Sequence, residues 1–448
     1  MIAIGGAGMS VVAELLLAQG YQVSGSDQSD SSVLERLRSR GARVHVGHDP
    51  AHVAHLGPQD LVVVSTAVAA DNVELRAATE AGVPVRHRSQ ALALAAEGKD
   101  FVAVAGAHGK TTTAAMLAVA LRAAGQDPSF AIGGRVVALD TGAHLGTGRV
   151  LVAEADESDG SFLNYDPQVA IITNVEPDHL DHYGTAPAYA AAFEQFAAKV
   201  RGLLVINADD DGAAALADRL RERGGRVRAY GLDPRADVQV EVRHLGAGQS
   251  GARVTSNLGG VELDLAVPGE HNLLNATAAW CAGVELGVDP AEMATALGSF
   301  SGTARRFEWR GTVAGVRVVD DYAHNPTKVA AAIATARRAA AGGRVLAVFQ
   351  PHLYSRTRDF AADFARSLRG ADQVWLLPIY PAREEPLEGV TSELIAEHLP
   401  GAFLGESGFA AVAHSVALEA RAGDLVLTIG AGDVTTLAEQ ILAQLEHE

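Results

Sequence analysis

One short segment of the chain has the glycines, lysine and hydroxyl side chains of a phosphate-binding loop. It reads Gly106-Ala107-His108-Gly109-Lys110-Thr111-Thr112-Thr113 and lies between the apolar residues 101–105 and a helical pattern that ends near Gly125. In such a loop, backbone N–H groups surround an anion, the helix N-terminus adds its dipole, the lysine reaches the outer phosphates, and a hydroxyl can bind Mg²⁺. Val104 stands where the usual pattern has a glycine. The strand before the segment and the helix after it still favour a nucleotide site over a chance turn, so we expect ATP binding.

Two acidic segments follow later strands, close to this loop in the expected sheet. The first, Glu154-Ala155-Asp156-Glu157-Ser158-Asp159, follows a strand at 149–153, and the second, 174–182, follows a strand at 169–173 and contains His179. Acid clusters are usually solvated turns, but a carboxylate at the carboxyl end of a strand beside a phosphate loop is a common Mg²⁺ ligand. We therefore expect Glu154 to bind Mg²⁺, with the other acids as surface or support. His179 alone fits a hydrogen-bonded helix-start residue equally well, and the nearby phosphate loop favours a ligand.

A second glycine-rich loop opens the chain. It reads Gly5-Gly6-Ala7-Gly8-Met9-Ser10, and Asp27 ends the second expected strand about where a dinucleotide-binding fold holds a ribose. The third glycine of that fingerprint is replaced by Val11, which is too bulky for the close helix packing that the motif requires. A loop that holds a nucleotide diphosphate by backbone N–H groups is compatible with this change, whereas NAD as a redox cofactor is disfavoured. A plain tight turn is the alternative.

Three polar segments in the second half of the chain follow or open regular elements. The segment 268–275 opens a helix; one of its asparagines is expected to cap it, and Asn272 and Asn275, three apart, can face an adenine edge. The segments 305–308 and 320–326 place charge at the passage into a last domain. The segment 350–358 follows a buried strand, so its polar groups emerge at the ligand-binding edge of a sheet. There we expect functional roles for His352 and Arg356, while Arg358 fits a surface residue equally well.

The hydrophobic pattern predicts an α/β protein of three domains. Short apolar runs alternate with helical patterns, as in parallel doubly wound sheets. We expect a Rossmann-like domain at 1–97, a central ATP-binding domain at 98–302 with a mostly parallel sheet, and a Rossmann-like α/β domain at 303–448. Between 227 and 267 the pattern changes to alternation, which predicts an antiparallel patch in the central domain.

Composition excludes several classes of function. The 448 residues are 48% hydrophobic and carry a formal net charge of −18, which gives no long-range attraction to nucleic acid or anionic lipid. The single cysteine, Cys281, has apolar neighbours and is expected to be a packed, inert thiol. No signal peptide or membrane-spanning run is evident. We therefore expect a cytoplasmic protein that binds neither nucleic acid nor membranes.

Taken in order, these motifs resemble those of the Mur ligases of peptidoglycan synthesis. The resemblance covers nearly the whole chain and is strongest to the alanine-adding members, through the run 154–159 and through Gln350-Pro351-His352 followed by 355–358. It implies ATP-dependent ligation of L-alanine to the lactoyl carboxylate of UDP-N-acetylmuramate through an acyl phosphate, with Mg²⁺ as the cofactor. It implies a monomer or weak homodimer.

The resemblance also implies a role for individual residues. Lys110 would neutralise the outer phosphates, Thr111 and Glu154 would hold one Mg²⁺, and His179 with Glu154 a second. Nucleotide contacts would further come from Gly106, Ala107, His108, Gly109, Thr112, Asn272, Asn275, Arg306 and Asp321. The UDP-sugar would be bound by Ala7, Gly8, Met9, Asp27, Ser65 and Thr66, with Arg86 nearby. Arg356 would hold the alanine carboxylate, with His324 and His352 near its amine.

The chain departs from the family pattern in three places, and other functions compete. Its first strand is shorter than usual, 186–198 contains no lysine that could be carbamylated as a metal ligand, and Asn325 replaces a common histidine. The competing functions are a ligase that recycles murein peptides, a folate polyglutamating ligase, an NAD-dependent redox enzyme and a nucleotide-binding regulatory protein. The segments 154–159 and 350–358 argue against the first, and the incomplete glycine fingerprint argues against the redox enzyme.

Overall fold

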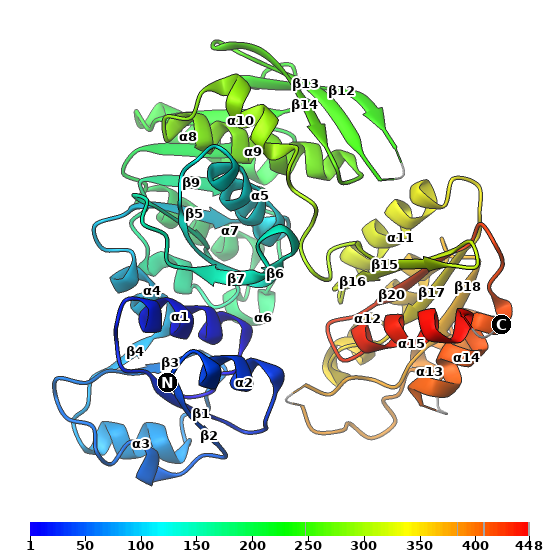
Figure 1. Ribbon diagram of the computed structural model, residues 1–448, viewed down its shortest axis with the longest axis horizontal. Helices are drawn as coiled ribbons and strands as arrows, with labels where there is room; N and C mark the ends of the chain where they lie inside the picture. Colours follow the sequence, from blue (N-terminus) through cyan, green and yellow to red (C-terminus); the bar gives the residue numbers. More distant parts are fainter. Residues whose placement is uncertain (247, 383, 406–407, 447–448) are drawn as a thin grey trace. The chain divides into compact units, whose positions relative to one another are not determined.

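The computed structural model describes the whole chain except residues 247, 383, 406–407 and 447–448 (Figure 1). The first of two compact units comprises residues 1–244, 250–266 and 270–301; the second comprises residues 302–448 with the short stretches 245–249 and 267–269. Among the described residues, no helix is both long and apolar enough to cross a membrane.

The amino-terminal part of the first unit, residues 1–97, consists of parallel strand pairs between helices. Its elements are α1 (Ala7–Ala18), β1 (Ser24–Asp27), α2 (Ser32–Ser39), β2 (Arg43–Val46), the 3-10 turn η1 (Pro50–His52), β3 (Val62–Val64), α3 (Val73–Glu80), β4 (Val85–His87) and α4 (Arg88–Ala95). β1 pairs with β2 and β3 with β4, both in parallel. The first residues, expected as a strand, form only a bridge at Ile2, yet Ile4 N donates to Ser26 O at 3.0 Å and Ile2 N to Val63 O at 3.0 Å. They therefore join the two pairs into one parallel arrangement.

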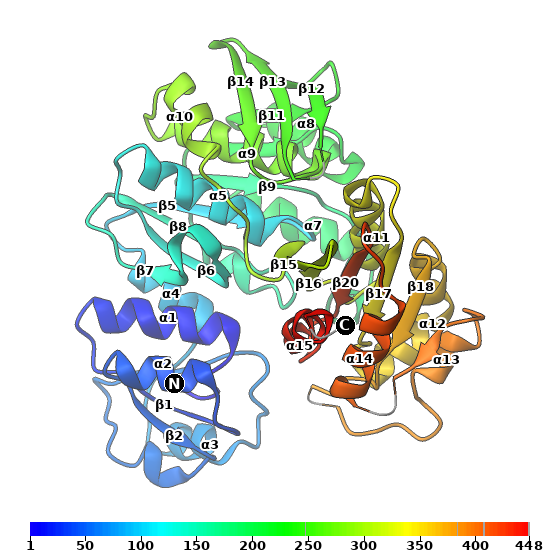
Figure 2. The same cartoon turned by 45° about the vertical axis from the view of Figure 1, so that its right-hand side comes forward.

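The central part of the first unit contains a ten-stranded sheet of order β14-β13-β12-β11-β10-β9-β5-β8-β6-β7 (Figure 2). The strands are β5 (Asp100–Ala105), β6 (Ser129–Val136), β7 (Thr141–His144), β8 (Val150–Glu154), β9 (Val169–Ile172), β10 (Leu203–Asn207), β11 (Val227–Gly231), β12 (Val238–Leu245), β13 (Ser250–Ser256) and β14 (Gly259–Leu265). The helices and turns are α5 (Lys110–Ala123), η2 (Val137–Leu139), η3 (Ser161–Asn164), α6 (Leu180–Tyr183), α7 (Ala186–Ala197), α8 (Asp211–Glu222), α9 (Glu270–Glu285) and α10 (Pro290–Leu297). β8, β5, β9, β10 and β11 run parallel, and both edges end in antiparallel pairs, β6 with β7 and β13 with β14.

The antiparallel patch expected from 227 to 267 was only partly right. β13 and β14 are antiparallel, but β11 pairs in parallel with β10, and β12 in parallel with β11. The helix α8 connects β10 to β11. A helical crossover between two strands lets the second strand run in the same direction as the first, so the pair is parallel. Alternating polarity indicated strands here without fixing their direction.

A shared core joins the two parts of the first unit. Met9, Val12 and Leu15 of α1 belong to the same buried cluster as Phe162 of η3 and Phe193 of α7. Strand residues at every second position of β5, β8 and β9 face this cluster, while α5 and α9 pack together on the opposite face. The apolar core is therefore continuous across the boundary that the sequence placed near residue 97.

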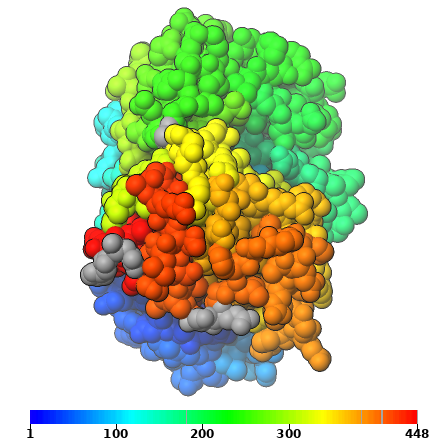
Figure 3. Space-filling model, turned by 90° about the vertical axis from the view of Figure 1, so that its right-hand side faces the viewer, coloured from blue at the N-terminus to red at the C-terminus, as the bar shows by residue number. Residues whose placement is uncertain are grey.

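The second unit is a doubly wound sheet of order β15-β16-β20-β17-β18-β19. Its strands are β15 (Glu308–Val313), β16 (Val316–Asp321), β17 (Val345–Phe349), β18 (Gln373–Leu376), β19 (Phe403–Leu404) and β20 (Leu425–Ile429). Its helices are α11 (Pro326–Ala340), α12 (Tyr354–Leu368), α13 (Glu393–Ala396), α14 (Phe409–Glu419) and α15 (Thr435–Leu445). All strand pairs are parallel except the edge pair β15 and β16. α11 and α12 bury one face of the sheet, and α14, the orange-red band in Figure 3, buries the other together with α15.

Candidate functional site

The phosphate-binding loop lies between β5 and α5 and is shaped by two glycines. Gly106 has φ +133° and Gly109 has φ +82°, a region that favours glycine. A Cβ on Gly106 would lie 2.1 Å from Thr173 Oγ1, and one on Gly109 would lie 2.7 Å from Asn275 Oδ1. His108 N donates to Asn174 Oδ1 at 3.0 Å. The loop is therefore held from β9 and α9 while the N-terminus of α5, which has no side-chain cap, points at the position of an anion.

Lys110, the first residue of α5, is held by a buried carboxylate. Its Nζ donates to Gly106 O at 2.6 Å and to Glu157 Oε1 at 2.9 Å, and lies 2.7 Å from Glu157 Oε2. Burial disfavours the charged lysine, but Glu157 and Asp156 outweigh it and raise the pKa of Lys110. The ammonium is therefore charged and already placed at the loop.

Thr111 and Glu154 form a small oxygen cluster at the loop. Thr111 Oγ1 donates to Glu154 Oε2 at 2.9 Å, and Gly133 N donates to Oε1 at 2.7 Å. A hydroxyl and a carboxylate beside a phosphate site are the hard oxygen ligands that suit Mg²⁺, which usually keeps several waters and takes the rest from phosphates. Among the described residues, no group of three or more His, Cys, Asp or Glu could hold a metal by itself. The donor set fits an ion that nucleotide oxygens complete.

His179 lies beside Glu157. It caps α6 with φ +50°, and its Nε2 is 3.8 Å from Glu157 Oε1 and 3.8 Å from Asp178 Oδ2. The sharing of a second metal between His179 and Glu154 stays a prediction.

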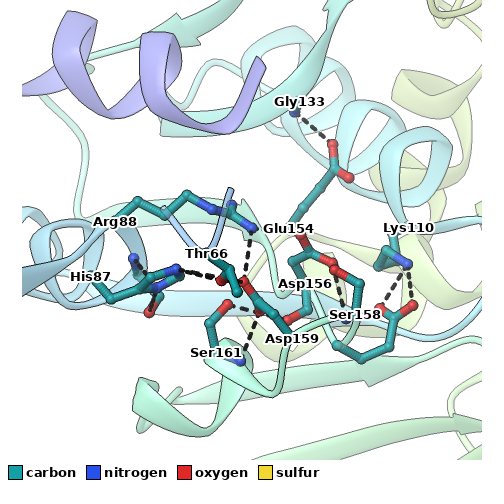
Figure 4. A network of polar contacts seen from close by, with 12 residues as sticks. Thr66, His87, Arg88, Lys110, Gly133, Glu154, Asp156, Ser158, Asp159 and Ser161 are labelled. Carbon is teal, nitrogen blue, oxygen red and sulfur yellow. Dashed lines mark hydrogen bonds and ion pairs between the residues drawn. The ribbon is translucent and has the colours of Figure 1, made fainter. Parts of the chain in front are cut away.

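The four carboxylates of the segment 154–159 are directed at different partners (Figure 4). While Glu154 and Glu157 face α5, Asp156 Oδ2 lies 2.5 Å from Arg88 Nη2. Asp159 accepts a short hydrogen bond from Thr66 Oγ1 and lies 3.5 Å from His87 Nε2. Sequence reasoning left these acids, apart from Glu154, as surface or support. In the structure, this one segment reaches both the phosphate loop and the amino-terminal part.

Arg88 is a site residue that sequence reasoning missed. A Cβ on Gly8 would lie 2.6 Å from Arg88 Nη1, so the guanidinium packs directly on the first glycine loop. Burial opposes the charge of Arg88, but Asp156 raises the pKa of Arg88. Burial also opposes the charge of Asp156, but Arg88 and Lys110 lower the pKa of Asp156 to about 2. Arg86, named from the sequence, is exposed and donates to Val85 O. The position of Arg88 directly after β4 could have indicated a site residue, because polar groups at the carboxyl end of a parallel strand face the ligand edge of the sheet.

The other residues expected at the UDP-sugar site surround the first glycine loop. Asp27 Oδ2 accepts from Gly5 N at 2.8 Å, and Oδ1 accepts from Gln28 N at 2.8 Å, so this carboxylate shapes the loop. Ala7 is exposed and Met9 is buried at the start of α1, which has no side-chain cap. Ser65 and Thr66 follow β3.

The two asparagines of α9 differ in position. Asn275 is buried, with its Oδ1 against Gly109, and Asn272 lies in the first turn. Asn275 thus contacts the backbone of the phosphate loop. From the sequence we expected it to face an adenine edge.

In the second unit, Asp321 and two arginines order the segment that follows β16. Asp321 accepts from Phe307 N and Ala323 N, both at 2.8 Å, and burial raises its pKa. The guanidinium carbons of Arg305 and Arg306 lie 4.8 and 5.1 Å from the centre of the Tyr322 ring, within cation–π distance.

His324, His352 and Arg356 come together at the carboxyl edge of this sheet. Arg356 Nη1 is 3.4 Å from His352 Nδ1 and 3.5 Å from His324 O. Burial, with Lys328 nearby, lowers the pKa of His324 to about 3. Its Nδ1 lies 3.0 Å from Tyr322 O, a pure acceptor, so Nδ1 carries the proton and Nε2 is an acceptor.

Three family models match the chain in succession. They are "Mur ligase family, catalytic domain" over residues 1–100, "Mur ligase middle domain" over 104–283 and "Mur ligase, glutamate ligase domain" over 305–432. Together they cover most of the chain.

Similar proteins and structures carry related names. A UDP-N-acetylmuramate–L-alanine ligase of Kineococcus radiotolerans is 56% identical over 99% of this chain and 95% of its own length, and one of Cutibacterium acnes is 47% identical over 99% and 95%. The crystal structure of a UDP-N-acetylmuramate–alanine ligase of Thermotoga maritima has a TM-score of 0.83 at 28% identity, covering 100% of this chain and 98% of its own. A murein peptide ligase of Psychrobacter arcticus has a TM-score of 0.73 at 26% identity, with the same coverage.

Proposed function

Because the chain belongs to the Mur ligase family, we propose that it joins L-alanine to the lactoyl carboxylate of UDP-N-acetylmuramate at the expense of ATP, in peptidoglycan precursor synthesis. The observation that carries this proposal is the phosphate loop with Lys110, Thr111 and Glu154 in place, in a chain about half identical over its full length to alanine-adding ligases.

The reaction divides one difficult condensation into two steps. A carboxylate oxygen of the muramoyl group attacks the γ-phosphorus of ATP, ADP leaves, and an acyl phosphate forms. The neutral amine of L-alanine then attacks the acyl carbon, the bond to phosphate breaks, and the nitrogen passes a proton to the departing phosphate, which gives the amide and inorganic phosphate.

The central part of the chain binds ATP in this proposal. Backbone N–H groups of 106–112 surround the phosphates, and the Lys110 ammonium screens the outer ones, which lets a carboxylate approach phosphorus. Thr111 and Glu154 would hold Mg²⁺, with His179 at a second ion; bound Mg²⁺ neutralises phosphate charge. Asn272, Asn275, Arg306 and Asp321 keep their expected assignment to the nucleotide.

The amino-terminal part binds the UDP-sugar in this proposal. The uncapped start of α1, with Ala7, Gly8 and Met9, offers N–H groups to the diphosphate, and Asp27 holds the loop in shape. Ser65 and Thr66, which follow β3, are assigned to the same ligand. Arg88, packed on Gly8, takes the place of Arg86 as the nearby cation.

The second unit binds L-alanine in this proposal. Arg356 grips the carboxylate, and the acceptor Nε2 of His324 orients the amine, with His352 beside it. A histidine whose pKa is about 3 stays neutral and accepts a hydrogen bond without taking the proton away.

We keep three further expectations as parts of the proposal. The three domains, 1–97, 98–302 and 303–448, are defined by the ligand that each binds, although the first two share one apolar core. The protein acts in the cytoplasm, and it is a monomer or weak homodimer. Its partners are small molecules, with neither nucleic acid nor membrane among them.

Phosphate release tests the function. The purified protein is given ATP, Mg²⁺ and UDP-N-acetylmuramate with L-alanine, glycine, L-serine or the tripeptide used in murein recycling, one at a time. We expect release with L-alanine in excess of the others. Release with the tripeptide alone would assign the recycling reaction, and nucleotide binding without release under any condition would assign a regulatory protein.

A further inference from the structure

Glu157 occupies a position that the proposed reaction leaves unexplained. Its side chain is fully buried, yet both carboxylate oxygens lie within 2.9 Å of Lys110 Nζ. Its backbone is fixed as well, because Tyr183 Oη donates to Glu157 O at 2.5 Å. The lysine that should meet nucleotide phosphates is therefore bound to a buried carboxylate.

A buried carboxylate and a phosphate compete for the same ammonium. Lys110 Nζ has three hydrogens. Gly106 O and Glu157 Oε1 accept from it, and Glu157 Oε2 lies 2.7 Å away, so three oxygens already surround the ammonium. Charge-assisted bonds of this kind are about twice as strong as neutral ones, so nucleotide binding must weaken or replace the contact with Glu157.

We propose that Glu157 is a positioning residue that holds the Lys110 ammonium at the phosphate loop before nucleotide binds and releases it to the outer phosphates when nucleotide arrives. The inference rests on the proposed function only in requiring that a nucleoside polyphosphate binds this loop.

Two consequences separate this role from simple packing. First, Glu157→Gln removes the competing charge with little change of shape, so ligands that reach Lys110 through an outer phosphate should bind more tightly, while AMP, which lacks one, should not. Second, the variant leaves Lys110 without its buried partner in the empty protein, so ADP should raise its melting temperature by more than it raises that of the wild type.

The experiment is calorimetric titration of full-length protein with ADP and with AMP, in magnesium-free buffer with a chelator. For Glu157→Gln we expect the Kd of ADP to fall about tenfold and that of AMP to change less than about twofold. Glu176→Gln is the matched control. Glu176 Oε2 lies 3.5 Å from Nε2 of His108, a residue of the phosphate loop, and the substitution removes one carboxylate as Glu157→Gln does. That variant should leave the ratio of the two constants unchanged.

A double-mutant cycle isolates the contact itself. In a Lys110→Met background, Glu157→Gln should no longer alter the Kd of ADP. If Glu157→Gln does not fold, Glu157→Asp, whose carboxylate is one methylene further from Nζ, should give the same change in smaller size.

Each outcome is decisive. A wild type that binds ADP neither in this buffer nor with Mg²⁺ added overturns the proposed function. Wild-type binding with an unchanged or weaker ADP affinity in Glu157→Gln, an equal change for AMP, or the same effect in Glu176→Gln or in the Lys110→Met background overturns the role of Glu157 alone.

Discussion

At the scale of single residues, Arg356 is the test of amino-acid recognition. A guanidinium grips a carboxylate through two parallel N–H bonds, whereas an ammonium provides a point charge. We expect Arg356→Lys to raise the KM for L-alanine about tenfold, equivalent to roughly 1.4 kcal/mol, with the KM values for ATP and UDP-sugar little changed. Steady-state kinetics with each substrate varied in turn measures this. Arg358→Lys is the control, because Arg358 is exposed and paired with Asp359 at 2.7 Å. If Arg356→Lys raised only the KM for ATP, the assignment of Arg356 to the alanine site would be wrong.

The buried histidine of the same cluster should make stability depend on pH. The pKa of His324 is about 3 in the folded protein against an ordinary value of 6.5. Above pH 6.5 both states are neutral; as pH falls from 6.5 towards 3, the unfolded chain binds a proton that the folded one does not, so stability is lost. His324→Gln lacks this loss. The melting temperature of the variant relative to the wild type should therefore rise as pH falls from 6.5 to 4, and a constant difference would contradict the assignment.

The sequence predicted single site residues where a motif combines residue type with position along a strand or helix. Lys110, Thr111 and Glu154 lie together at the carboxyl edge of the central sheet, as the pattern indicated. Arg88 and Glu157 were missed because their roles depend on contacts across the fold. Arg88 meets Gly8 and Asp156, 80 and 68 positions away; its place after β4 could indicate a ligand edge but not these partners.

At the scale of elements, the loop before α5 depends on glycine for space as well as for backbone conformation. Gly109→Ala would bring a methyl group to 2.7 Å from Asn275 Oδ1, whereas the matched position Gly125, at φ +73°, has nothing within 4 Å. Both variants bear the strain of a positive φ, of order 1 kcal/mol. We expect only Gly109→Ala to weaken ADP binding, by about tenfold or more, in the same calorimetric titration. Equal losses in both variants would mean that strain alone is responsible.

The ion pair between Arg88 and Asp156 links α4 to the segment after β8. Its members are one-fifth and one-third exposed, so removing one charge leaves the other partly desolvated. Arg88→Gln should destabilise the protein by roughly 1–2 kcal/mol and raise the KM for UDP-sugar, with the Kd of ADP little changed. Arg149→Gln, which removes a pair whose arginine is 87% exposed, should cost under about 0.5 kcal/mol. Chemical unfolding and kinetics check both, and a loss of ADP binding alone in Arg88→Gln would rule out this arrangement.

The type of an element could be predicted where its hydrophobic run was long. The direction of a strand, and the strands at the edges of a sheet, could not be predicted. The buried strands β5, β8 and β9 lie within one residue of their expected bounds, because parallel strands covered on both faces are continuously apolar. The edge strands β15 and β19 were not predicted. β19 has two residues and β15 carries a bulge between Trp309 and Gly311, and neither feature gives a periodic signal.

At the scale of the whole molecule, the distribution of buried side chains decides where the chain can be cut. Met9, Val12 and Leu15 share a core with Phe193 and Phe196. The clusters of the second unit contain residues from 316 onward only. A domain should fold alone when its own core is complete, so the boundary near 302 is a better place to divide the chain than the one near 97.

Fragments of the chain test this directly. Residues 1–301 should fold and still bind ADP through the phosphate loop, more weakly than the full chain because Arg306 and Asp321 are absent. The fragment should release no phosphate, because the residues assigned to L-alanine are absent as well. Residues 98–301 should aggregate or melt at a much lower temperature. Without α1 the apolar surface that it covers is exposed to water, which costs about 25 cal/mol of free energy per Å². Circular dichroism, light scattering and calorimetry distinguish the cases. A soluble, cooperatively melting 98–301 fragment with full ADP affinity would show that the core shared with α1 contributes little, and that residues 1–97 fold as a separate domain.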